Sequence, residues 1–77
     1  MTPEDCIEGA EKMRETLIRG IALANRIHTI SKQNIGAEPD YHATACIMAF
    51  DAGCDLRGCL VSLDRFTEIL RKDAKLD

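Results

Sequence analysis

The sequence predicts an all-α fold, an antiparallel helical hairpin of two long helices joined by a short turn near residues 34–39. Apolar residues recur every three or four positions in two long stretches, and residues typical of turns gather between them. The second stretch is apolar on nearly all sides, so we expect hairpins to assemble into a four-helix bundle dimer or a higher oligomer. At 77 residues the chain forms a single helical domain, 1–77, near the lower size limit for folding alone.

The first helix is predicted over about residues 3–33. Thr2 can cap it, Pro3 suits its first position, and Asp5 can complete a capping box near the positive end of the helix dipole. Apolar or small residues then follow at helical spacing, while charged residues occupy the opposite side. The spaced residues are Cys6, Ala10, Met13, Leu17, Gly20, Ile21 and Ala24.

The second helix is predicted over about residues 40–72, followed by a short C-terminal tail. Asn34 or Gly36 can end the first helix in the left-handed conformation, and Pro39 suits the start of the second. Interior glycine disfavours helix by about 1 kcal/mol relative to alanine, so a break at Gly53 or Gly58 is an open alternative.

Small residues are expected to let the two helices come close together. With a turn centred near residue 37, facing residues have numbers that sum to roughly 74. This register puts Gly20 opposite Gly53 and His28 opposite Cys46. The predicted helix-packing residues are Gly20, Ala24, Ala45, Ala49 and Gly53.

Two apolar stripes run along the second helix. The broader one is expected to pack on the first helix, and it contains Ala45, Ala49, Ala52, Leu56, Cys59, Leu60, Leu63, Phe66 and Leu70. The narrower one, the outer stripe, consists of Ile47, Phe50, Cys54 and Val61. One hairpin cannot cover both, so we expect the outer stripe to be an interface, either with a second copy or with a different protein.

Candidate chemistry is sparse. Cys54 and Cys59, in the stretch GCDLRGC, point about 140° apart on a helix, which excludes a shared chelate or disulfide. His28, His42 and Cys46 are a candidate zinc ligand set if the turn brings them together. Asp51 and Asp55 form a carboxylate pair on what we interpret as a solvated strip, and no catalytic motif accompanies them. We therefore expect neither enzymatic activity nor a cofactor.

The charge balance limits the partners. A net charge of −3 without a basic cluster argues against nucleic acid, and no apolar run is long enough for a membrane span. The acidic start lacks the layout of a signal peptide, so we expect a cytoplasmic protein with its four cysteines reduced.

The resulting hypothesis is a small non-enzymatic protein that acts by protein–protein interaction, as an adaptor, inhibitor or regulator. Its format also suits the small factors with which phages and mobile elements block host machinery. One alternative is an oligomeric protein that binds a small ligand in pockets between helices, near His28, Lys32, Tyr41 and His42. The other is a His/Cys metal-binding protein.

Overall fold

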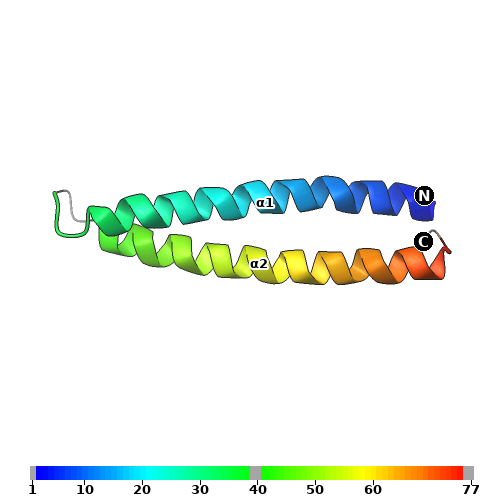
Figure 1. Ribbon diagram of the computed structural model, residues 1–77. Coiled ribbons are helices and arrows are strands. Elements are labelled where there is room, and N and C mark those ends of the chain that lie inside the picture. Colours follow the sequence, from blue (N-terminus) through cyan, green and yellow to red (C-terminus); the bar gives the residue numbers. More distant parts are fainter. Residues whose placement is uncertain (1, 39–40, 76–77) are drawn as a thin grey trace.

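The computed structural model describes residues 2–38 and 41–75 and consists of two antiparallel helices (Figure 1). Helix α1 spans Pro3–Gln33 and helix α2 spans His42–Asp73. The chain reverses once, so α1 begins and α2 ends at the same end of a rod 56 Å long. The predicted all-α helical hairpin is confirmed, and α2 continues unbroken through Gly53 and Gly58.

A capping box fixes the start of α1. The backbone N–H of Asp5 donates to Thr2 Oγ1 at 3.2 Å, and the backbone N–H of Thr2 donates to Asp5 Oδ2 at 3.1 Å. Pro3 occupies the first turn, where its missing N–H leaves no donor unpaired. These contacts satisfy helix donors that would otherwise need water, as the sequence predicted.

The turn uses one of the two residues expected to adopt the left-handed conformation. Gly36 has φ of 93°, whereas Asn34 has φ of −111° and its side-chain amide donates to the carbonyl of Ile30 at 2.7 Å. Helix α2 begins at His42 without a side-chain cap. The predicted start of this helix at Pro39 and residue 40 lies outside the described residues.

The helices meet along an inner seam with a seven-residue repeat, the spacing that lets two helices supercoil around each other. On α1 the seam positions are Ile7, Ala10, Arg14, Leu17, Ile21, Ala24, His28 and Ser31. On α2 they are His42, Cys46, Ala49, Gly53, Leu56, Leu60, Leu63, Thr67 and Leu70. All of these side chains except that of Arg14 are buried or half-buried.

The register differs from the expected one by about one helical turn. Ala24 faces Gly53, where a Cβ built on the glycine would lie 3.6 Å from Ala24 Cβ, and Gly20 faces Leu56. Facing residues therefore have numbers that sum to about 77 rather than 74. The expected Gly20–Gly53 contact is wrong because α2 begins later than predicted, which moves the centre of the turn along the chain.

The core is thin. The buried apolar residues are Ile7, Ala10, Ala24 and Ala49, and no large side chain in the described part of the chain is fully buried. The accessible surface is 5802 Å², against about 4,700 Å² for a compact monomer of this mass. The radius of gyration is 17.1 Å, against about 11.5 Å for a compact domain of this length. Most of the apolar side chains therefore remain outside the hairpin.

The close approach at Ala24 predicts a strong position effect. Ala24→Leu should lower the free energy of unfolding by about 1–3 kcal/mol, because the larger side chain has to push α2 away at Gly53. Ala22→Leu is the matched control, since Ala22 is exposed, and should change stability by less than about 0.5 kcal/mol. Urea denaturation followed by circular dichroism measures both, and equal stability of the two variants would contradict the packing at Ala24.

Candidate interaction surfaces

Two broad faces flank the inner seam, each formed by both helices. The first, the apolar face, follows a second seven-residue repeat on each helix. On α1 it contains Cys6, Gly9, Met13, Thr16, Gly20, Leu23, Ile27 and Ile30. On α2 it contains Ala45, Met48, Ala52, Asp55, Cys59, Ser62, Phe66 and Ile69. Asp55 is the only charged residue in this set.

The large side chains of the apolar face point into solvent. Met13, Leu23, Ile27, Met48 and Ile69 are each at least half exposed. A shallow groove crosses the middle of the face and reaches around α2 to Cys54, with Met13, Cys59 and Ser62 also in its lining. The groove forms because Gly58 has no side chain, and a Cβ built there would meet nothing within 4 Å. The face thus combines exposed large residues with a hollow among small ones.

The opposite face, which we call the mixed face, carries most of the charges that lie beside the seam. On α1 it contains Glu8, Glu11, Glu15, Ile18, Ala22, Asn25, Thr29 and Lys32. On α2 it contains Ala43, Ile47, Phe50, Cys54, Arg57, Val61, Asp64, Glu68 and Arg71. Its two halves differ, with ion pairs toward the chain termini and apolar residues toward the turn.

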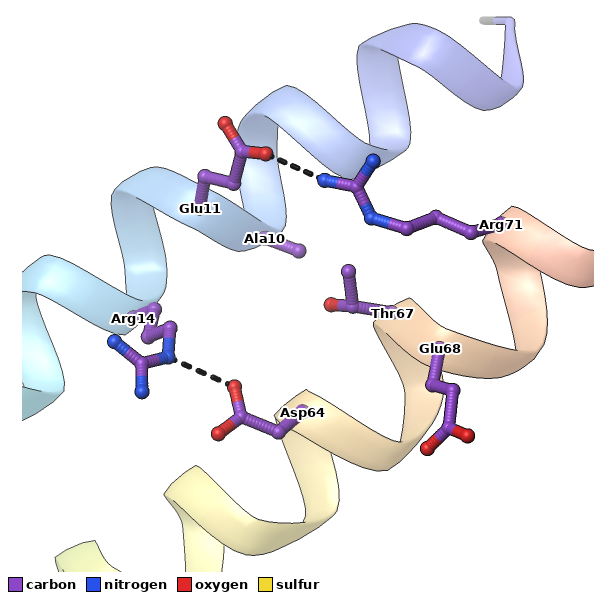
Figure 2. Close-up of a pocket in the computed structure, with 7 residues that line it drawn as sticks. All are labelled: Ala10, Glu11, Arg14, Asp64, Thr67, Glu68 and Arg71. Atoms are coloured by element: carbon purple, nitrogen blue, oxygen red, sulfur yellow. Dashed lines mark hydrogen bonds and ion pairs between the residues drawn. The ribbon is translucent and has the colours of Figure 1, made fainter. Parts of the chain in front are cut away.

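Two ion pairs bridge the helices at the terminal end of the mixed face (Figure 2). Arg14 Nε donates to Asp64 Oδ1 at 2.9 Å, and Arg71 Nη2 donates to Glu11 Oε1 at 2.7 Å. Ala10 and Thr67 lie between the bridges and are small enough to leave a shallow polar pocket. Within each pair the arginine neutralises the carboxylate of the other helix. The pocket therefore joins the two helices and leaves no unpaired charge from these four residues to bind an ion.

A third bridge holds the middle of the mixed face, where Arg57 Nη2 donates to Asn25 Oδ1 at 2.7 Å. Each of the three bridges joins two residues that lie at the same level along the long axis of the rod. All three can therefore form in only one register of the two helices. A slip by one helical turn would separate all three. The charged and polar residues of this face therefore contribute to alignment, although each exposed pair is worth only about 0.2–1 kcal/mol.

The outer stripe runs along the mixed face from its turn half to just past the middle of α2. Ile47, Phe50, Cys54 and Val61 are all exposed, and the Phe50 ring lies 5.8 Å from the ring of His28. The stripe is therefore available to a partner, and it meets the groove of the apolar face at Cys54.

Fewer residues of the broader stripe of α2 pack on α1 than the sequence predicted. Of the predicted helix-packing residues, Ala24, Ala49 and Gly53 are buried, while Gly20 and Ala45 are half-buried. In contrast, Ala52, Cys59 and Phe66, which were expected to pack on α1, are exposed. The expectation is wrong for these three because α1 covers only the seam positions of α2, and the stripe extends beyond them onto the apolar face.

The candidate zinc ligands do not come together. Within residues 2–38 and 41–75, no three His, Cys, Asp or Glu side chains are placed to hold a metal ion. His28 packs against Phe50, and the ring of His42 lies 4.3 Å from that of Tyr41. The Nδ1 atom of His42 is buried and has no hydrogen-bond partner among the described residues. The set His28, His42 and Cys46 is therefore not assembled in the hairpin.

No protein family matches this chain, and no curated protein or solved structure shows significant similarity to it. Neither helix, as far as the described residues go, is long and apolar enough to cross a membrane.

The bridges of the mixed face predict a charge-reversal effect. Asp64→Arg should destabilise the hairpin by about 0.2–1 kcal/mol, because it places two cations together, and adding Arg14→Asp should restore most of this loss. The recovery should weaken in molar salt, where exposed charges are screened. Asp51→Arg is the control, as Asp51 forms no cross-helix bridge among the described residues. Failure of the double variant to recover would show that the bridge contributes nothing to the register.

Proposed function

We propose that this hairpin is a small non-enzymatic protein that acts by binding other protein chains, as an adaptor, inhibitor or regulator in the cytoplasm. One observation carries the proposal: the apolar side chains are mostly outside the fold. Large residues such as Leu23, Ile47, Met48, Phe50 and Val61 are more than half exposed, while the buried apolar residues of the described part of the chain are one isoleucine and three alanines.

Covering the exposed apolar side chains with a partner protein is energetically more favourable than leaving them in water. Full burial of one large apolar side chain is worth about 1.5–3 kcal/mol, so a partner that covers several of them gains substantial binding energy. Singly exposed apolar residues are ordinary, but here they form continuous stripes along helices. Ion-paired polar clusters support a role without catalysis, and the four free cysteines fit a reducing compartment.

The outer stripe favours an amphipathic helix as the binding element of the partner. Ile47, Phe50, Cys54 and Val61 follow α2 at the spacing of one helical stripe, so a second helix can lie alongside them. Beyond Val61 the carboxylates of the mixed face are ion-paired within this chain, as in Arg14–Asp64 and Lys72–Glu68. The match to a partner helix therefore comes from apolar residues along one of its sides.

The proposal predicts a partner whose capture depends on the outer stripe. The immobilised wild-type chain should retain at least one protein from a lysate of its native host, and Ile47→Asp or Val61→Asp should abolish that retention, because each buries a carboxylate in the contact. Quantitative mass spectrometry of the retained proteins is the measurement.

Arg26→Asp is the control, since Arg26 is exposed and belongs to neither face. It should retain the same protein, and circular dichroism should show unchanged helicity for all variants. The proposed function would be refuted if the wild-type chain and Ile47→Asp retained identical sets of proteins.

A further inference from the structure

We propose that the apolar face is covered by a second copy of this chain, in a twofold dimer that forms a four-helix bundle. This inference rests on the proposed function and deepens it, because it assigns the apolar face to self-association and leaves the outer stripe for a different protein. It also places self-association on the side of α2 opposite to the stripe for which the sequence predicted an interface.

The first argument is geometric. On both helices the apolar face repeats with the seven-residue spacing of the inner seam, so each helix has two seams and the hairpin uses only one of them. The two unused seams lie side by side and run antiparallel. The surface that fits them best is another pair of antiparallel helices at the same separation, and the hairpin itself is such a pair.

The second argument concerns charge. A twofold interface brings each surface against itself, so a face with an excess of one charge repels its copy. The mixed face has ion-paired carboxylates at its terminal end, so covering it would take these exposed pairs out of water, which costs free energy. The apolar face has a single charged residue, Asp55, so like-charge repulsion on pairing this face with itself is confined to the two copies of that carboxylate.

The third argument concerns area. The apolar face extends from residue 6 to residue 30 of α1, about 36 Å at 1.5 Å per residue, and the rod is 17 Å wide at most. Pairing would bury about 600 Å² per copy, at the lower end of the range for stable interfaces. It would also remove about half of the roughly 1,100 Å² by which the accessible surface of the hairpin exceeds that of a compact monomer.

Asp55 lies near the middle of the apolar face and lines its groove. In a twofold dimer both Asp55 carboxylates enter the same interface, where a charge without a cationic partner weakens the contact. Replacement of Asp55 by leucine should therefore strengthen the association.

Adjacent residues of α2 provide a matched test. Met48 is 65% exposed and belongs to the apolar face, while Ile47 is 63% exposed and belongs to the mixed face. Sedimentation equilibrium should give a dimer, twice 8.5 kDa, for the wild type at micromolar concentration. Met48→Asp should raise the dissociation constant by on the order of 100-fold or more, Ile47→Asp should leave it unchanged, and Asp55→Leu should lower it.

One cysteine gives an independent readout in the unmodified protein. Cys59 lies on the apolar face and is exposed in the single hairpin. In the dimer Cys59 is covered, so iodoacetamide should alkylate it more slowly at protein concentrations above the dissociation constant than at concentrations well below it. In Met48→Asp the alkylation should be fast at every concentration. Because the dilution series uses the unmodified protein, it stays informative even if a variant folds poorly.

The outcomes separate this inference from the proposed function. A monomeric wild type whose Cys59 is alkylated at the same rate at every protein concentration, or a dimer broken by Ile47→Asp but not by Met48→Asp, overturns the inference. Capture of a host protein through the outer stripe can still succeed in either case. Conversely, a dimer that depends on Met48 and retains no host protein supports the inference and refutes the proposed function.

Discussion

The close packing of α1 on α2 at small seam residues is the constraint on which the rest of the structure depends. Where Ala24 meets Gly53, two backbones approach with almost no side chain between them. Such contact aligns the helices accurately, but it buries little apolar volume, because alanine and glycine have little to bury. The hairpin therefore stays slender, and its larger apolar residues lie on the faces beside the seam. The surfaces proposed for binding are in this sense a consequence of how the two helices pack.

Much of the fold follows from local signals that the sequence shows directly. The capping box at Thr2 and Asp5 and the left-handed glycine at position 36 are short-range features, and the helical spacing of apolar residues is visible without tertiary information. The register could not be predicted as well, because it depends on where α2 begins and therefore on the shape of the turn. An error of one helical turn was enough to replace the expected Gly20–Gly53 contact by the pairs Ala24–Gly53 and Gly20–Leu56.

The division of α2 into seam and faces shows a second limit of sequence reasoning. A helical projection groups Leu56, Cys59 and Phe66 into one wide stripe, since all three lie within the same half of the helix. Only the position of α1 decides that Leu56 is half-buried while Cys59 and Phe66 are exposed. A signal was nevertheless available: α1 also carries apolar residues at a second seven-residue spacing, from Met13 to Ile30, and two such repeats on both helices indicate two separate contact surfaces.

The ion pairs at the open end of the rod also bear on the order in which the hairpin forms. Contacts near the turn close short loops, whereas the bridge between Glu11 and Arg71 closes almost the entire chain. Folding that starts beside Gly36 and proceeds outward adds each layer of the seam at a small further loss of chain entropy. The terminal layers then form last and open first. The two bridges at that end oppose fraying where the helices have no covalent connection to hold them together.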